Sequence, residues 1–278
     1  MIRALLALAL LSASNVVGAE PLTFYNGRLF IQAKVNQVPT EALLDSGAEA
    51  TIVDSSFAAK AKLPEGIAQI IKGSGGNAPA RMIEGATVEA LGIELHPEAV
   101  GVLDLTDLSQ RLIKRPTNAI VGRELFDSAR LRIDILGGDI AVVNRNASPL
   151  GKMLWLTGHA GIESISVLVN GLKVQADFDL GNGSDVLISR ALVKKLGLKI
   201  IGSKAGGGIG GGLKRDLVRV RFLEVVGRRF LNVVAAIDDQ PGHNDLNVGT
   251  SILKNFLITT DFKQGAVWLR PVAGARPA

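Results

Sequence analysis

The chain has 278 residues, a formal net charge of +5 and no cysteine. Without cysteine, disulfide bonds, a thiolate nucleophile and a zinc–thiolate site are all excluded. The positive charge is dispersed along the chain rather than gathered in long runs, which argues against nucleic-acid binding. Since no disulfide bond can form, stability must come from the packing of a hydrophobic core.

Residues 1–19 have the features of a secretory signal peptide. Arg3 supplies the positive charge, residues 4–11 are apolar, and Val17-Gly18-Ala19 offers small residues suited to cleavage before Glu20. The alternative is an uncleaved anchor, but the apolar run is shorter than the roughly 20 residues that a spanning helix needs. No later segment could span a bilayer. We therefore expect an exported protein, periplasmic or secreted, with no membrane span in its mature chain.

Short runs rich in Val, Ile and Leu alternate with Gly-rich or polar breaks after this segment. The pattern predicts an all-β protein, mainly antiparallel, with a few short helices. Asn170-Gly171 is a strong hairpin signal, and Ser189 and Gly197 are expected to cap and to end a helix. The expected elements are strands over 29–35, 41–44, 51–53, 165–169, 173–178 and 186–188, a turn over 36–39, and helices over 55–61 and 189–196.

One short pattern occurs twice, 134 positions apart (179 minus 45): an apolar strand, an Asp, and a Gly two residues later. The copies are Leu43-Leu44-Asp45-Ser46-Gly47-Ala48 and Asp177-Phe178-Asp179-Leu180-Gly181-Asn182. A duplicated unit with one carboxylate per copy predicts two lobes whose acids meet at a pseudo-twofold axis. Two carboxyl groups a few ångströms apart cannot both ionise, so the pair would share one proton and could activate a water molecule.

Each copy also contains a glycine-rich stretch between two strand-like segments, residues 73–76 and 206–212. The second stretch satisfies the dinucleotide-binding fingerprint formally, but Val218, Val220 and Phe222 alternate with arginines in strand period where that motif needs a helix. We expect these glycines to form hairpin tips that act as flaps over a cleft. For the second stretch, a loose connector is the alternative interpretation.

Both copies close with an apolar-Gly step, Ile120-Val121-Gly122 in the first and Asn247-Val248-Gly249 in the second. The expected organisation is a signal peptide (1–19), an N-terminal lobe (20–143), an inter-lobe connection (144–161), a C-terminal lobe (162–272) and a tail (273–278). Within the connection, residues 153–156 could add a strand shared between the lobes.

With these motifs in this order, the chain resembles the retropepsin-like aspartic proteases, in a duplicated, single-chain, two-lobe form. The resemblance is carried by Asp45-Ser46-Gly47-Ala48, by Ile120-Val121-Gly122 and by the flap glycines. It implies two β-barrel lobes, a peptide-cleaving activity without metal or cofactor, and a hydrogen bond from Ser46 between the lobes. The site residues expected are Asp45 and Asp179 as catalytic groups, Ser46, Gly47 and Gly181 as loop support, and Ala48, Glu49, Gly73, Ser74, Gly75, Gly76, Gly208, Ile209 and Gly210 as substrate-binding positions.

The second copy departs from the family pattern at three positions. Leu180 replaces the hydroxyl residue, Asn182 stands where the first copy has Ala48, and Asp185 stands where it has Thr51. Either Ser184 or a backbone amide compensates, or the second lobe is only a scaffold. The sole tyrosine is Tyr25, so no phenol is available to a flap.

These departures leave open what the chain does. The expected function is an aspartic endopeptidase, a monomer acting on polypeptides. The alternatives are a catalytically inactive relative that binds peptides or envelope components in the same cleft, and a homodimer that pairs two first lobes.

Overall fold

The computed structural model describes residues 18–159, 161–239 and 244–272. Most of the expected signal peptide and the expected tail at 273–278 lie outside these ranges. β-strands dominate the described residues, which confirms the all-β prediction. No helix in this part of the chain is long and apolar enough to cross a membrane.

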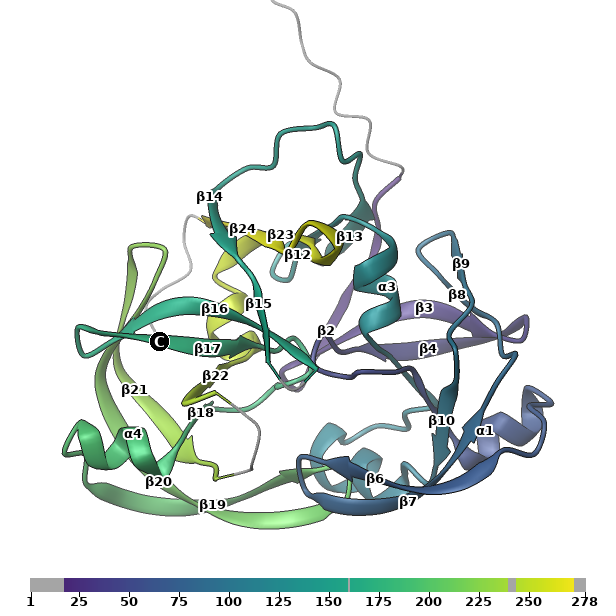
Figure 1. Cartoon of the computed structure of the whole chain (residues 1–278), viewed down its shortest axis with the longest axis horizontal. Coiled ribbons are helices and arrows are strands. Elements are labelled where there is room, and N and C mark those ends of the chain that lie inside the picture. Colours follow the sequence, from purple (N-terminus) through teal and green to yellow (C-terminus); the bar gives the residue numbers. More distant parts are fainter. Residues whose placement is uncertain (1–17, 160, 240–243, 273–278) are drawn as a thin grey trace, which may run out of the picture.

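The strands form three sheets, one in each half of the chain and one shared between the halves (Figure 1). The ten-stranded sheet has the order β6-β7-β10-β5-β11-β4-β3-β8-β9, with β2 paired to β3. Its members are β2 (Thr23–Tyr25), β3 (Arg28–Val35), β4 (Val38–Leu44), β5 (Ile52–Asp54), β6 (Ile67–Gly73), β7 (Gly76–Ile83), β8 (Val88–Ala90), β9 (Ile93–Leu95), β10 (Val100–Leu103) and β11 (Ala119–Val121).

The eight-stranded sheet lies in the second half, in the order β15-β16-β17-β22-β18-β21-β20-β19. Its members are β15 (Thr157–His159), β16 (Ile162–Val169), β17 (Leu172–Phe178), β18 (Val186–Ile188), β19 (Ile200–Gly208), β20 (Gly211–Val225), β21 (Arg228–Ile237) and β22 (Leu246–Val248). Three strands keep the bounds of their first-half counterparts at an offset of 134: β3 with β16, β4 with β17, and β5 with β18. The strand that delivers each Asp also has an equivalent parallel neighbour, β11 beside β4 and β22 beside β17.

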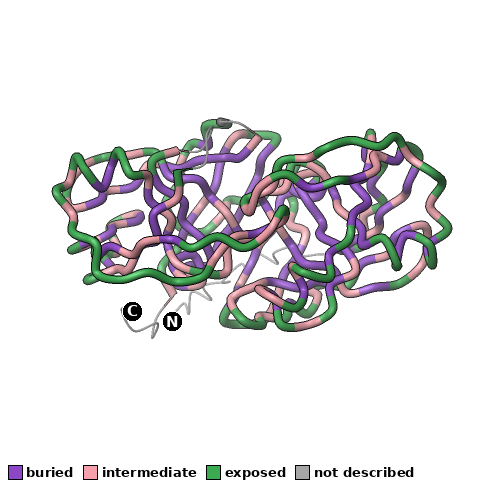
Figure 2. The backbone as a smooth tube through the Cα atoms, turned by 90° about the horizontal axis from the view of Figure 1, so that it is seen from below, coloured by how far each residue is buried: buried purple, intermediate pink, exposed green. Residues whose placement is uncertain are grey.

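The shared six-stranded sheet joins the two halves in the order β1-β13-β12-β23-β24-β14. Its members are β1 (Glu20–Pro21), β12 (Leu131–Asp134), β13 (Asp139–Val142), β14 (Lys152–Trp155), β23 (Phe256–Asp261) and β24 (Ala266–Pro271). Strand β12 pairs antiparallel with β23, and β14, from the expected connection, pairs with β24. The sheet ties chain segments about 130 residues apart into one structure with a buried interior (Figure 2).

The helices are short and follow the strands. They are α1 (Ser55–Lys60), α2 (Thr106–Leu108), the π-helix η1 (Ser109–Ile113), α3 (Arg123–Ser128), α4 (Arg190–Lys195), α5 (Thr250–Leu253) and the 3₁₀-helix η2 (Phe262–Gln264). The Ser189 hydroxyl accepts from the amide of Leu192 and so caps α4, and Gly197 follows the helix at φ +62°. The Asp54 carboxylate caps α1, a role that the sequence analysis missed.

The turn expected over residues 36–39 is shorter than predicted. Asn36 and Gln37 form it, with φ of 46° and 65°, and Pro39 lies inside β4. Val35 and Val38 close this hairpin, so Lys34 and Pro39 form the next, non-hydrogen-bonded pair across the ladder. Proline has no amide proton, and none is needed at position 39 for pairing with β3. On the other side of β4, strand β11 pairs only at Leu43 and Leu44, so no neighbour requires an amide proton from Pro39 there either.

Candidate active site

The first acidic loop begins where β4 ends. The amide of Asp45 donates to the carbonyl of Val121 on β11 at 3.0 Å, which fixes the start of the loop. The amide of Gly47 then donates to Asp45 Oδ1 at 2.8 Å. The carboxylate is thus held by the backbone of its own turn.

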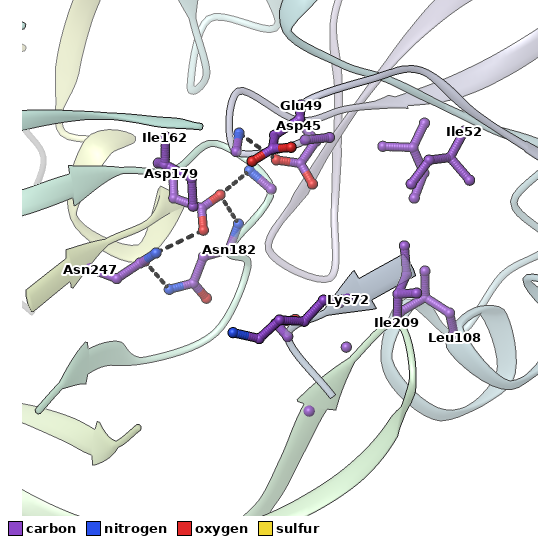
Figure 3. Close-up of a pocket in the computed structure, with 18 of the residues that line it drawn as sticks. Asp45, Glu49, Ile52, Lys72, Leu108, Ile162, Asp179, Asn182, Ile209 and Asn247 are labelled. Atoms are coloured by element: carbon purple, nitrogen blue, oxygen red, sulfur yellow. Dashed lines mark hydrogen bonds between the residues drawn. The ribbon is translucent and has the colours of Figure 1, made fainter. Parts of the chain in front are cut away.

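The second acidic loop repeats this arrangement after β17. The amide of Asp179 donates to the carbonyl of Val248 at 3.2 Å. Asp179 Oδ1 accepts from the amides of Gly181 and Asn182, both at 2.9 Å. Asp179 Oδ2 accepts from the side-chain amide of Asn247 at 2.8 Å (Figure 3).

The two loops pack directly against each other through their glycines. A methyl group built on Gly181 would lie 2.1 Å from Cγ of Asp45, and one on Gly47 would lie 3.1 Å from Oδ1 of Asp179. Each glycine therefore leaves room for the carboxylate of the opposite loop. This close approach brings together the two acids that the sequence analysis paired.

Ser46 links the loops from one side only. Its buried hydroxyl donates to the carbonyl of Phe178 at 3.0 Å and accepts from the amide of Leu180 at 2.9 Å. At the equivalent position of the second loop, Leu180 is fully buried as an apolar side chain. Ser184 does not replace the missing hydroxyl, since it bonds to Asn182 Oδ1 within its own loop.

An asparagine pair supports the second carboxylate. Asn182 Nδ2 donates to Asn247 Oδ1 at 2.8 Å and to the carbonyl of Asp185 at 3.1 Å. These contacts orient the amide of Asn247 so that its nitrogen points to Asp179. Asn247 occupies the place of Ile120 in the first copy, and this polar-for-apolar exchange was the signal in the sequence that could have identified it.

The surroundings shift the acidity of both carboxyl groups. Burial and, to a smaller extent, the nearby charge of Asp179 together raise the pKa of Asp45 to about 7, against the opposing effects of the Gly47 and Ala48 amides and the charge of Arg28. Burial also raises the pKa of Asp179, while the hydrogen bonds from Asn247, Asn182 and Gly181 act in the opposite direction because they stabilise its charged form. The pair therefore holds a proton that ordinary aspartates would have lost near neutral pH.

Both carboxylates open into a cleft of about 690 Å³. Two hairpins, β6–β7 and β19–β20, form the roof of the cleft on the side opposite the acidic loops. In Figure 1 this roof lies at the bottom of the view, where the two hairpins approach each other. Strand pairing in the second hairpin runs to Gly208 and Gly211, so the glycine-rich stretch is an ordered hairpin and the loose-connector alternative is wrong.

The tips of the two flaps interlock. The amide of Gly75 donates to the carbonyl of Ile209 at 2.8 Å. Arg215 also joins the two flaps, since it donates to the carbonyl of Ser74 at 3.2 Å. Arg111, on η1, holds the second flap by donating to the carbonyls of Gly206 and Gly208, both at 3.0 Å. Neither arginine was singled out from the sequence.

Most of the expected substrate-binding residues line this cleft. They are Ala48, Glu49, Gly73, Ser74, Gly208 and Ile209. Gly75, Gly76 and Gly210 instead lie where the flap tips meet, and a methyl group on Gly210 would come within 2.2 Å of the carbonyl oxygen of Gly76. These three glycines therefore serve contact between the flaps rather than contact with the floor of the cleft.

The comparisons with known proteins bear on the first half of the chain. Residues 31–124 match the family described as aspartyl protease. This range includes the Asp45 loop, the first flap and Ile120-Val121-Gly122, so the resemblance to retropepsin-like aspartic proteases is confirmed there. None of the curated proteins compared with the chain matches it.

Proposed function

We propose that the chain is an aspartic endopeptidase in which Asp45 and Asp179 share one proton and activate a water molecule. The observation that carries the proposal is the pair of carboxylates, each packed against the glycine of the opposite loop, on the floor of a roofed cleft. The match of residues 31–124 to an aspartyl protease family supports protease activity in general. The assignment of both carboxylates to catalysis is the proposal.

The hydrogen bonds favour different roles for the two acids. Asp179 accepts from two amides and from Asn247, and this stabilises its ionised form as the general base. Among the described residues, Asp45 is supported only by the backbone amides of Gly47 and Ala48, has no side-chain donor like Asn247 and has a pKa of about 7, so it retains the proton as the general acid.

Hydrolysis then proceeds in two steps. Water attacks the carbonyl carbon while Asp179 takes a proton from it and Asp45 gives its proton to the carbonyl oxygen. The resulting diol collapses when Asp179 passes its proton to the amide nitrogen, the carbon–nitrogen bond breaks, and Asp45 recovers the proton of one hydroxyl. Both carboxyl groups return to their starting state, and no covalent enzyme intermediate forms.

The substrate in this proposal is an extended polypeptide lying between the loops and the flaps. Backbone groups at the flap strands would bind its main chain as an added strand. Because the tips are joined by the bond from Gly75 to Ile209, the flaps must separate for a chain to enter.

The test is cleavage of a peptide library by the purified protein between pH 3 and 9. We expect Asp45→Asn and Asp179→Asn each to reduce turnover by about 10²- to 10⁴-fold, the range typical of a lost acid or base. Asp104→Asn, at an exposed aspartate that accepts from the amide of Thr106, is the matched control and should retain full activity. Unchanged turnover in both dyad variants would refute the proposal.

The second candidate is a catalytically inactive protein that binds peptides in the same cleft, and Leu180 is the observation that favours it. Binding of library peptides without cleavage at any pH would establish this alternative. Loss of activity in Asp45→Asn but not in Asp179→Asn would show that the second half supports the site without supplying a catalytic group.

We also propose that the protein is exported and acts as a monomer, with no nucleic acid as partner. The basis is the signal-like segment at residues 1–19, together with the presence of one acidic loop in each half of a single chain. Cell fractionation tests export, and sedimentation of the purified protein tests the monomer. Cytoplasmic retention of the full chain or a stable dimer would contradict the respective part.

A further inference from the structure

Two positions beside the carboxylates carry opposite charges in a pattern that the duplication makes visible. Arg28 is the first residue of β3, and Ile162 is the first residue of β16, 134 positions later. Glu49 follows the first acidic loop, and Gly183 is its counterpart at the same offset. Each pair therefore contains one charged and one uncharged residue, and the two charges have opposite signs.

Each charged side chain lies against the backbone of the other half. A methyl group on Gly183 would come within 2.7 Å of Arg28 Cγ and 2.8 Å of its Nη1. A methyl group on Gly161, just before β16, would come within 1.9 Å of Glu49 Oε1. The cleft thus has an Arg28 subsite, formed by Arg28 and the loop at Asn182 and Gly183, and a Glu49 subsite, formed by Glu49, Gly161 and Ile162.

Both charges are available to a ligand. Arg28 and Glu49 line the cleft, and neither forms an ion pair with another residue in the ranges 18–159, 161–239 and 244–272. Arg28 donates one hydrogen bond to the carbonyl of Asn26 at 3.2 Å, which leaves the other N–H groups of its guanidinium to bind a ligand. Burial lowers the pKa of Arg28, and the charges of Asp45 and Asp179 act in the opposite direction, so it lies within the field of the dyad.

The other charged side chains of the cleft are placed differently. Arg215 and Asp238 neutralise each other as a buried ion pair at 2.9 Å. Lys72 comes from flap strand β6 and lies on the roof side of the cleft, across from the loops (Figure 3). At the level of the dyad, Arg28 and Glu49 are therefore the charges that distinguish the two ends of a bound chain.

We propose that the cleft selects polypeptides that carry an acidic side chain on one side of the cleaved bond and a basic side chain on the other. The acidic side chain pairs with Arg28 and the basic one with Glu49, and this inference rests on the proposed endopeptidase function. A partly desolvated guanidinium binds a carboxylate through charge-assisted hydrogen bonds, and the same reasoning applies to Glu49 and an ammonium or guanidinium group. The opposite signs also fix the direction in which an extended substrate lies, a choice that two equal subsites would leave open.

The experiment uses matched peptides of identical composition in which an acidic and a basic residue flank the cleavage position in either order. We expect the protein to cleave one order at least about tenfold faster in kcat/KM, a difference equivalent to one charge-assisted contact. The double variant Arg28→Glu with Glu49→Arg should prefer the opposite order. The matched control is the exchange Lys34→Glu with Glu89→Lys, at a surface ion pair of 2.9 Å away from the cleft, which should leave the preference unchanged.

Two further readouts keep the inference refutable. If the exchanged variant loses its fold, seen as a lower melting temperature, then Arg28→Gln and Glu49→Gln should each reduce the preference between the two orders. An unchanged order in the exchanged variant, or an unchanged preference in both glutamine variants, overturns the inference. Equal cleavage of all charge arrangements refutes the inference and leaves the proposed function standing, whereas cleavage of no peptide at any pH refutes both.

Discussion

The two acidic loops have the same backbone course but different side-chain support. Asp45 is held by the amide of Gly47, and its loop contributes the Ser46 hydroxyl that bonds to the second loop. Asp179 is held by two amides and the side chain of Asn247, and its loop contributes the buried Leu180. The first loop thus supplies the link between the halves, and the second supplies the better-stabilised carboxylate. The difference shows how a duplicated turn can give two identical side chains different hydrogen-bond support.

The largest expected effect comes from closing the space between the loops. Gly181→Ala should reduce kcat by at least about 100-fold, because its methyl group would displace the carboxyl group of Asp45, and small misplacements of reacting groups have costs of this size. Gly47→Ala should cost less, since its methyl group would meet Asp179 Oδ1 at 3.1 Å. Steady-state kinetics of the two variants measures the contrast, and equal losses would show that the loops are equally tolerant.

The next effect concerns Asn247. Asn247→Leu imitates the apolar residue of the first copy and removes the hydrogen bond to Asp179 Oδ2. Without this donor the pKa of Asp179 rises, so the acid limb of the pH–rate profile should move up by about one unit and kcat should fall about tenfold. Asn118→Leu, which removes a bond to the Thr40 hydroxyl outside the cleft, should keep the wild-type profile. An unmoved acid limb in Asn247→Leu would remove Asn247 from the positioning of the base.

A third comparison is the stability of Asp45→Asn as a function of pH. The folded-state pKa of about 7 lies above the unfolded value, so the native state binds its proton more tightly, and wild-type stability falls as the pH rises from about 4 to 7. Asparagine cannot ionise, so the variant should gain stability relative to the wild type over this window, by on the order of 4 kcal/mol. Urea unfolding at pH 4 and pH 8 measures the change. A pH-independent difference between the proteins would contradict the raised pKa.

The smallest expected effect is the loss of the link from Ser46. Ser46→Ala leaves the carbonyl of Phe178 and the amide of Leu180 unpaired in a buried place, at a cost of about 1 to 3 kcal/mol in the free energy of unfolding. Ser46→Thr keeps the hydroxyl and serves as the control. Wild-type stability in Ser46→Ala, measured by urea unfolding, would show that water or other groups replace both bonds.

The features that could be predicted from the sequence are those whose signals lie in neighbouring residues. Asn170-Gly171 adopts φ values of 49° and 89°, as the hairpin signal predicted, because turn chemistry is contained in two adjacent residues. The turn at Asn36 was predicted to be longer than it is, because whether Pro39 can lie in a strand depends on which neighbouring strands pair with that position. The Asp54 cap was missed for a similar reason, because the residue also ends β5.

The sequence by itself determined the β class, the two acidic turns with their glycines, and the flap hairpins, because alternation, strand-to-turn spacing and glycine content are local properties. The tertiary structure decided which residues surround the acids. Asn247 reaches Asp179 from 68 positions away (247 minus 179), and Arg28 crosses to the loop at Gly183. It also decided that the flap tips meet, since Gly75 bonds to Ile209. Such contacts depend on how distant strands pack, and packing between distant segments leaves no periodic trace in the chain.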